Sequence, residues 1–577
     1  MSQQQLARQT EQRLGLVPRI FKAIANISQG KSSRAKRRTA LGHSLGWVGE
    51  FPLKLSLVVL SLLTEPAMAQ SQTNVLTYHN DNARTGQNLN ETILTPSNVN
   101  ATTFGKLFIA SVDGKVDAQP LYMSNIAISG QGTHNVLFVA TEHDSLYALD
   151  ADTGTTLWQV SLLKSQETPS DNRNCGQVTP EIGITATPVI VPNIGRHGTI
   201  YVVAMTKDAS SNYFQRLHAL DIATGAEEFG GPKDIQATFP GTGDNSSGGK
   251  VVFDPKQYEE RAGLLSLNGV VYTTWASHCD IRPYTGWVIG YDETSLAQSR
   301  VLNFTPNGNE GSVWASGAGP AADDNGNIYF LAANGTFDTT IDAKGFPNSG
   351  DFGNSFLKLS TSNRTLAVAD YFAMFNTVAE SNADQDLGSG GALVLPQMRD
   401  ALGQIKYLAV GAGKDRNIYL VNRTRMGKFN PNNNSNIYQE LPGALSGPEF
   451  AMPAYFNNTL YYGAVGDQLK AFQFANAKLA NSPSSETSNN FGYPGTTPSI
   501  SAAGTSNGIV WAVENGSTSV LHAYDATHLS YELYNSNQAA AGRDQFGAGN
   551  KFITPTIANG KVYVGTTNSI AAFGLLK

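Results

Sequence analysis

One unit recurs eight times along the chain, and this repetition limits the folds open to it more than any other feature. Each copy is an apolar strand, a turn and a second strand, as in VLFVATEHDSLYALDADTG at 136–154 and KVYVGTTNSIAAFGLLK at 561–577. A strand of small residues, often with a proline, precedes each copy, as in DAQPLYM at 117–123. The units average about 62 residues between Pro120 and Pro555, which is enough for four short strands with their loops.

The copies alternate apolar and polar residues with a period of two, and no stretch after residue 69 sustains a helical period. Four-stranded antiparallel sheets repeated around an axis form a β-propeller. The sequence therefore predicts an all-β, eight-bladed β-propeller. The last copy ends at the C-terminus without a fourth strand, whereas FGKLFIASVDG at 104–114 lies before the first copy. We expect this N-terminal strand to complete the last blade and close the ring.

The first 69 residues differ in composition from the rest, with 10 Lys and Arg against 3 Asp and Glu. Basic Lys54, the apolar run that follows it and the small residues of Ala67-Met68-Ala69 predict a secretory signal that is cleaved near Ala69. An uncleaved membrane anchor is the alternative. The sequence thus divides into an N-terminal extension with a signal (1–69), a leading segment (70–103) and the propeller (104–577). We expect the mature chain to be exported, to a periplasm or to the medium.

After residue 69 the balance is acidic, with 30 Lys and Arg against 43 Asp and Glu. This excess of carboxylates argues against a nucleic-acid partner. No later segment approaches the ~20 apolar residues of a transmembrane helix. We therefore expect no membrane span in the mature chain.

The order of strands in a propeller assigns each loop to one of two faces. Loops from the second strand to the third, and from the fourth to the next blade, share a face, and the long charged loops fall there, among them WASHCDIRPYTGW at 275–287. The motifs DADTG, DIATG and DETS join third and fourth strands and predict turns capped by Asp. DDNGN at 323–327 resembles a calcium loop in composition but is better placed for a hairpin turn.

Cys175 and Cys279 are the two cysteines of the chain, and both fall in loops of the same face in adjacent blades. A disulfide between them is the first interpretation, since an exported chain meets an oxidising environment. Two unpaired thiols are the second interpretation. A nucleophilic Cys279 activated by His278 is the third, although neighbouring side chains in an extended segment point to opposite sides.

The candidate site residues lie on this loop-rich face. Paired carboxylates can perform acid and base catalysis, and the candidates for that role are Glu181, Glu260, Glu310 and Asp338. The ligand-face candidates are His278, Asp280, Arg282, Trp314 and Arg261. For a metal, Glu181 and Asp280 are the candidates, and such carboxylates suit calcium. The plain alternative is a solvated acidic rim whose histidine is hydrogen-bonded in its loop.

Aromatic residues of this face either stack on sugars or pack between blades: Trp275, Trp287, Trp314, Tyr258 and Tyr284.

The segments ALDADTGTTLW at 148–158 and ALDIATGAEEF at 219–229 resemble the repeat of the quinoprotein superfamily, the eight-bladed pyrroloquinoline-quinone (PQQ) dehydrogenases and their non-catalytic relatives. YHNDNARTGQN at 78–88 is similar to a group of secreted bacterial propellers. The resemblance implies a quinone held between a tryptophan and a disulfide of adjacent cysteines, with calcium bound by Glu, Asn and Asp. Glu181 resembles the calcium-ligand glutamate. Trp314 matches the tryptophan that precedes the catalytic acid, but Ala315 follows it, and adjacent cysteines are absent from the sequence.

These departures favour an exported, quinoprotein-like propeller that acts as a non-catalytic binding or scaffold module through its loop-rich face. Its partner would be a small molecule, a glycan or a protein. A dehydrogenase of alcohols or sugars that depends on PQQ and calcium is the alternative, and a carboxylate-based hydrolase is the third hypothesis.

Overall fold

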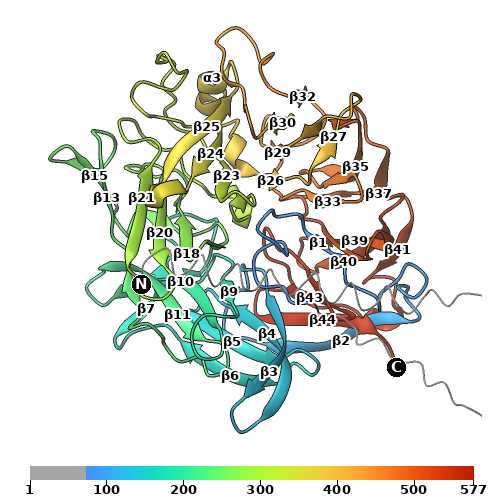
Figure 1. Ribbon diagram of the computed structural model, residues 1–577. Coiled ribbons are helices and arrows are strands. Elements are labelled where there is room, and N and C mark those ends of the chain that lie inside the picture. The colour runs from blue at the N-terminus through green and yellow to red at the C-terminus, as the bar shows by residue number, and fades with distance from the viewer. Residues whose placement is uncertain (1–72) are drawn as a thin grey trace, which may run out of the picture. The chain divides into compact units, whose positions relative to one another are not determined.

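Eight sheets of four or more strands follow one another along residues 73–577, which are the residues that the computed structural model describes (Figure 1). The predicted all-β fold is confirmed. Each small-residue segment noted in the sequence forms the first strand of one sheet, from β3 (Leu121–Ile128) to β42 (Thr556–Ala558). The predicted signal within 1–69 lies outside the described residues.

The first four sheets are named by their order along the chain. Their strands are β3, β4, β5 and β6 (Leu121–Ile128, Gly132–Ala140, Ser145–Asp150, Thr156–Ser161); β9, β10, β11 and β12 (Val189–Val191, Thr199–Asp208, Tyr213–Asp221, Lys233–Asp234); β17, β18, β20 and β21 (Leu265–Leu267, Val270–Thr274, Trp287–Asp292, Gln298–Asn303); and β22, β23, β24 and β25 (Ala321–Ala322, Asn327–Leu331, Phe356–Ser360, Ala367–Ala373).

The fifth to eighth sheets have the same layout. Their strands are β26, β29, β30 and β32 (Leu393–Val394, Leu408–Ala412, Ile418–Asn422, Gln439–Leu441); β33, β34, β35 and β37 (Ala454–Phe456, Thr459–Tyr462, Asp467–Ala475, Ser485–Phe491); β38, β39, β40 and β41 (Ser499–Ala503, Ser506–Glu514, Val520–Asp525, Glu532–Asn535); and β42, β43, β44 and β2 (Thr556–Ala558, Lys561–Gly565, Ser569–Leu575, Phe104–Ser111). In the eighth sheet β2 pairs antiparallel with β44.

Short elements extend these sheets or lie in the loops. They are β1 (Gln87–Asn88), β7 (Glu167–Asp171), β8 (Glu181–Ile182), β31 (Lys428–Phe429), β36 (Lys478–Leu479), the β13–β15–β14 sheet (Thr238–Pro240, Lys250–Val252, Ser246–Ser247), the β16–β19 pair (Tyr258–Glu259, Ala276–Ser277), the β27–β28 pair (Met398–Arg399, Ile405–Lys406), α3 (Thr377–Asn382), and the 3-10 helices η1 (Ala315–Gly317), η2 (Ser362–Arg364), η3 (Leu387–Ser389) and η4 (Ala540–Gly542).

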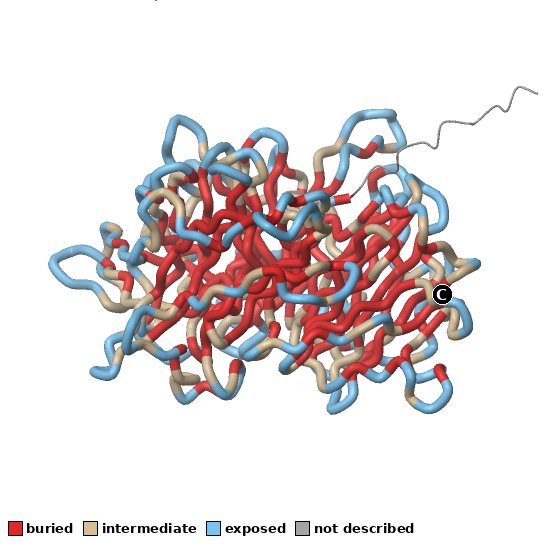
Figure 2. The backbone as a smooth tube through the Cα atoms, turned by 90° about the horizontal axis from the view of Figure 1, so that it is seen from below, coloured by how far each residue is buried: buried red, intermediate tan, exposed pale blue. Residues whose placement is uncertain are grey.

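The central strands are buried on both faces because neighbouring sheets pack face to face. β18 has every residue buried, whereas the outer strand β6 has one buried residue, Leu157, among exposed and half-buried ones. Figure 2 shows this as buried strands with exposed turns at their ends. One apolar cluster joins Trp287 of the third sheet to Tyr201 of the second, and another joins Tyr563 of the eighth sheet to Tyr122 of the first.

The turns between third and fourth strands have the predicted chemistry. Asp150 Oδ1 accepts hydrogen bonds from the backbone N–H groups two and three residues on, and Gly154 has a φ of 77°. Asp221 and Gly225 repeat this turn in the second sheet. Asp323 Oδ1 accepts from two backbone N–H groups between β22 and β23, so DDNGN forms the hairpin turn that its position predicted.

The described part of the leading segment (residues 73–103) runs along the first strands of the sheets. Its backbone bonds to six sheets, through Val75 with Tyr122, Leu76 with Ile190, Asn82 with Ala322, Ala83 with Val394, Thr85 with Tyr455, and Gly86 with Ile500. Side chains reach the other two: Asn82 Nδ2 donates to Ser266 O at 2.9 Å, and Asn88 Nδ2 donates to Ile557 O at 3.1 Å. The segment therefore touches the first strand of all eight sheets.

Two fully buried side chains, His79 and Arg84, fix this segment. The His79 ring lies between two carbonyl groups, with Nδ1 2.9 Å from Arg84 O and Nε2 2.9 Å from Pro498 O. Arg84 donates to Thr77 Oγ1 at 2.7 Å and to Pro320 O at 2.9 Å. Each bond satisfies a polar group that would otherwise be buried without a partner.

No helix within residues 73–577 is long and apolar enough to cross a membrane.

Candidate functional site

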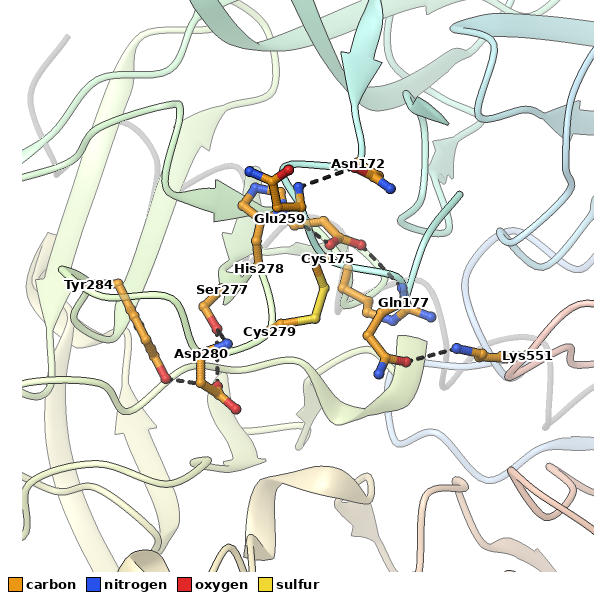
Figure 3. The surroundings of a disulfide bond; sticks show 12 residues. Asn172, Cys175, Gln177, Glu259, Ser277, His278, Cys279, Asp280, Tyr284 and Lys551 are labelled. Carbon is orange, nitrogen blue, oxygen red and sulfur yellow. Dashed lines mark hydrogen bonds and ion pairs between the residues drawn. A yellow bond between two sulfur atoms is a disulfide. The ribbon is translucent and has the colours of Figure 1, made fainter. Parts of the chain in front are cut away.

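A disulfide joins Cys175 to Cys279, with 5.5 Å between their Cα atoms and a sequence separation of 104 (Figure 3). It connects the loop before β8 to the loop after β19, so the predicted bridge between adjacent blades is confirmed. Both sulfur atoms are committed to this bond, and neither is a thiol nucleophile for His278.

The loop that carries Cys279 is held by hydrogen bonds on both sides of the disulfide. His278 is buried, with Nε2 3.1 Å from Tyr258 O and Nδ1 3.7 Å from Glu259 Oε2, and its burial lowers its pKa. Asp280 Oδ1 accepts from Tyr284 Oη at 2.8 Å (Figure 3). Arg282 points to solvent and donates two bonds of 2.7 Å to Asp244.

The disulfide lines a pocket of about 310 Å³. The pocket residues come from loops that precede or follow inner strands of sheets two to eight: Cys175, Gln177, Glu259, Arg261, Ala276, Ser277, Cys279, Asp280, Ser312, Trp314, Asp384, Asp386, Lys414, Phe450, Tyr493 and Phe552. The loops that strand order assigned to one face therefore meet around one cavity.

Four aromatic rings form one side of the pocket. Trp314 lies 5.8 Å from Phe450 and 6.2 Å from Phe552, measured between ring centroids, and Phe450 lies 5.8 Å from Tyr493. These tilted and edge-on contacts are the favoured geometry for aromatic pairs. The Arg261 guanidinium lies 4.8 Å from the Phe552 ring centre and extends the wall by a cation–π contact.

Acidic and basic side chains line the pocket beside these rings. Asp386 accepts a 2.7 Å hydrogen bond from Trp314 Nε1, and burial raises the pKa of Asp386 to about 7. Lys414 Nζ lies 2.6 Å from Asp384 and 3.9 Å from Asp386. Arg261 pairs with Glu259 at 3.1 Å. Each cation of the pocket therefore already has a carboxylate partner.

Three buried polar atoms of residues that line the pocket have no hydrogen-bond partner within residues 73–577. They are Asp386 Oδ1, Arg261 Nε and Ser312 Oγ, on side chains that are all less than a tenth exposed. An unpaired buried polar atom costs free energy, and native proteins keep few of them. Their position on one cavity marks a place where a ligand or water supplies the missing bonds.

Of the residues predicted from the sequence, the structure brings Arg261, Asp280, Trp314 and both cysteines to this pocket. The other candidates lie elsewhere. Glu181 is 2.9 Å from His143, and Glu260 is buried, accepts from Thr274 N and has a pKa well above its usual value because of burial. Glu310 lies beside Asp280, and burial followed by the charge of Asp280 raises its pKa. Asp338 accepts from two backbone N–H groups of its own loop.

Of the five aromatic residues singled out from the sequence, four pack between sheets and one lines the pocket. Trp275, Trp287, Tyr258 and Tyr284 are buried in the cluster between the second and third sheets, where they pack the blades together. Trp314 is half-buried and is the one that reaches the pocket. Packing between sheets thus explains four of the five.

A calcium ion does not fit the residues that the quinoprotein resemblance implied. Within residues 73–577 no group of three or more His, Cys, Asp or Glu is placed to hold a metal ion. Glu181, the expected ligand, bonds to His143 and does not line the pocket. Asp280, the other metal candidate, bonds to Tyr284 and Ser277.

Sequence reasoning missed several pocket residues, namely Ser312, Asp384, Asp386, Lys414, Phe450, Tyr493 and Phe552. One signal was present for two of them. Phe450 lies three residues before Pro453 and Phe552 three before Pro555, where a first strand of each sheet begins. Arg261 occupies the equivalent place before β17. This position lines the pocket in the third, sixth and eighth units.

Solved structures of three dehydrogenases share this fold. A quinohemoprotein alcohol dehydrogenase from Pseudomonas putida matches with a TM-score of 0.58 at 12% identity, over 87% of this chain and 80% of that chain. The quinohemoprotein alcohol dehydrogenase from Comamonas testosteroni gives 0.55 at 13%, over 87% and 80%. A europium-containing methanol dehydrogenase gives 0.51 at 10%, over 87% and 98%.

The chain therefore has a quinoprotein-like β-propeller fold, as the sequence resemblance predicted. No protein-family model matches the sequence, and no curated protein matches it. At these identities the likeness concerns the fold, and function has to be argued from the pocket.

Proposed function

We propose that this protein is an exported, eight-bladed β-propeller that binds a small organic molecule in the pocket of its loop-rich face and performs no catalysis there. The observation that carries the proposal is the cavity of about 310 Å³ with three unpartnered, buried polar atoms on residues of its walls. Small-molecule sites are concave, largely apolar and fitted with a few converging polar groups.

The eight-bladed ring is part of this proposal. Eight sheets of four or more strands occur within residues 73–577, and β2 adds to β44 in the last of them. Residues of the first and eighth sheets share one apolar cluster. In the proposed ring, β2 completes the last blade. Residues 104–577 then form the propeller, and the described part of the leading segment (73–103) lines the first strands.

Export is supported by the disulfide, because disulfides persist in oxidising compartments. The proposed signal at 1–69, with cleavage near Ala69, agrees with that chemistry.

A PQQ-dependent dehydrogenase is the second candidate, favoured by the names of the proteins that share the fold. Trp314 and the disulfide line the pocket, as that hypothesis expects. It ranks second because calcium ligands are not assembled and the cysteines are not adjacent. The hydrolase hypothesis ranks third, because Glu181, Glu260, Glu310 and Asp338 do not line the pocket.

Equilibrium dialysis against a low-molecular-mass extract tests the binding proposal without assuming a ligand. The mature protein should deplete one metabolite, as measured by mass spectrometry, and Ser277→Trp should abolish the depletion because the indole fills the cavity. Ser295→Trp, on an exposed turn away from the pocket, is the matched control. If no metabolite is depleted, the binding proposal is wrong.

The dehydrogenase candidate is tested separately, by adding PQQ and Ca²⁺ and assaying dye reduction with alcohols and sugars. Turnover would replace the non-catalytic proposal with that candidate.

A further inference from the structure

We infer that the ligand of this pocket is an uncharged, polyhydroxylated ring, supplied either as a free sugar or as the terminal sugar of a glycan. This inference rests on the proposed binding function and specifies its ligand class. Charge, hydrogen-bond pattern, aromatic surface and size each point to such a ring.

The charges of the pocket disfavour an anionic ligand. Four carboxylates line it, from Glu259, Asp280, Asp384 and Asp386, against the two cations Arg261 and Lys414. Both cations are already paired with carboxylates. Lys551 lies near the mouth, where it donates to Gln177 Oε1 at 2.8 Å (Figure 3). A phosphate or a polycarboxylate would bring further negative charge into an acidic cavity, so an uncharged ligand is favoured.

The unpartnered atoms require a ligand that both donates and accepts hydrogen bonds. Asp386 Oδ1 needs a donor when the carboxyl group is ionised, Arg261 Nε needs an acceptor, and Ser312 Oγ takes either. A carboxylate ligand would leave the ionised Asp386 Oδ1 unpaired, and an ammonium ligand would leave Arg261 Nε unpaired. Hydroxyl groups do both at once, and several of them on one ring reach several sites.

The aromatic wall supplies the apolar half of the contact. Trp314, Phe450 and Phe552 are half-buried, and Tyr493 is 47% exposed at the mouth. An apolar surface of this kind covers the C–H face of a sugar ring while the ring hydroxyls reach the polar side chains of the cavity. One cavity therefore offers both surfaces that a pyranose needs.

The size and the mouth of the pocket set how much of a saccharide enters. A volume of about 310 Å³ lies at the lower end of ligand pockets and suits one ring better than a chain. Exposed residues line the opening, among them Gln177, Asp280 and Asp384. A terminal sugar can thus enter while the rest of its glycan stays in solvent.

Isothermal titration with D-glucose, D-galactose and D-mannose, and with the uronic acid of each, tests the ligand class on the mature protein. At least one neutral sugar should bind, and its uronic acid should bind at least about ten-fold more weakly because it adds a negative charge. Trp314→Ala and Asp386→Asn should each weaken sugar binding by about ten-fold or more. Tyr531→Ala and Asp324→Asn, which alter exposed residues outside the pocket, are the matched controls.

A glycan array separates the two sources. Binding to terminally exposed sugars on the array assigns a glycan end, and binding only to the free sugar assigns a soluble saccharide. The dialysis experiment identifies the ligand independently. If the depleted metabolite lacks a polyhydroxylated ring, or if a uronic acid binds more tightly than its parent sugar, the inference is wrong and the binding proposal stands. If no metabolite is depleted and no sugar binds, both are wrong.

Discussion

Several carboxyl groups beside the inner strands are buried, and burial raises their pKa values, as in Glu449. Glu449 is fully buried just before β33, where Oε1 accepts from Ala451 N at 2.7 Å and Oε2 has no partner within the described chain. Burial raises the pKa of Glu449 to about 8. A neutral carboxyl group is cheaper to bury than a carboxylate, so the folded protein keeps this proton at pH values where the unfolded chain loses it.

Glu449→Gln should therefore become more stabilising as the pH rises. The folded-state pKa lies above the unfolded value, so the wild-type protein loses stability between about pH 4.5 and 8, and the uncharged variant does not. Relative to wild type, the free energy of unfolding of the variant should rise by about 2–4 kcal/mol across this range. Urea denaturation at pH 5 and pH 8.5 measures the difference, with the exposed Glu486→Gln as control. Equal differences at both pH values would contradict the assignment.

At the scale of single residues the sequence predicted part of the site. Strand order assigned Arg261, Asp280 and Trp314 to the loop-rich face, and they line the pocket. Asp386 and Lys414 lie in loops assigned to the same face but were not singled out, because strand order does not tell which side chains of an irregular loop turn inward. Glu181 matched a motif, yet its carboxylate bonds to His143 in a neighbouring turn.

At the scale of elements, the disulfide ties the second-sheet loop to the third-sheet loop on the rim of the pocket. It closes a loop of 104 residues, and cross-links of this length restrict the unfolded chain strongly.

Replacing both cysteines, as in Cys175→Ala with Cys279→Ala, should lower the free energy of unfolding by about 2–5 kcal/mol. The variant should also retain less of the dialysed metabolite, because both residues line the cavity. Urea denaturation with and without reductant checks the first effect, since the reductant should weaken wild type and leave the variant unchanged. A loss below about 1 kcal/mol would show that the bridge does not restrict the unfolded chain as the entropy argument requires.

The leading segment is held in place by buried polar side chains, which are uncommon in an exposed loop. Arg84 is fully buried and donates to Thr77, Tyr78, Pro320 and Leu264. Arg84→Met keeps much of the volume but leaves these acceptors without a donor, so we expect a loss of about 3–5 kcal/mol in the free energy of unfolding. Arg196→Met, at an exposed arginine, should change it by less than about 0.5 kcal/mol. Similar unfolding free energies for the two variants would contradict the role of Arg84.

The strands were predictable and the course of the leading segment was not. The eight first strands, from DAQPLYM at 117–123 to ITPTIA at 553–558, are visible in the sequence because they repeat, and most carry a proline. The leading segment has no repeat to detect, since it passes from one sheet to the next and meets each through different residues. Its buried His79 and Arg84 look like surface residues in a stretch rich in Asn.

At the scale of the whole molecule, the proposed ring depends on contacts between the two ends of residues 104–577. The central strands of each sheet are buried by neighbouring sheets, so an open end would expose an apolar sheet face to water. β2 pairs with β44, and Phe104 lies fully buried against Trp511, Tyr534 and Phe573. Forming a contact between residues so distant in sequence costs chain entropy. The contact persists only if the burial of apolar side chains such as Phe104 offsets that cost.

Phe104→Ala tests whether this contact closes a ring. Truncating a buried phenylalanine costs about 3–5 kcal/mol, and Phe372→Ala, between the fourth and fifth sheets, is a control of equal size and burial. In a closed ring, Phe104→Ala should loosen the last blade first, so native-state hydrogen exchange should accelerate in β44 and in β39 and β41 of the neighbouring seventh sheet while β23 and β30 stay protected. Phe372→Ala should give the opposite pattern. If both variants accelerate exchange in the same strands, the pairing of β2 with β44 does not act as a separate point of closure. The eight sheets would then unfold as one cooperative unit.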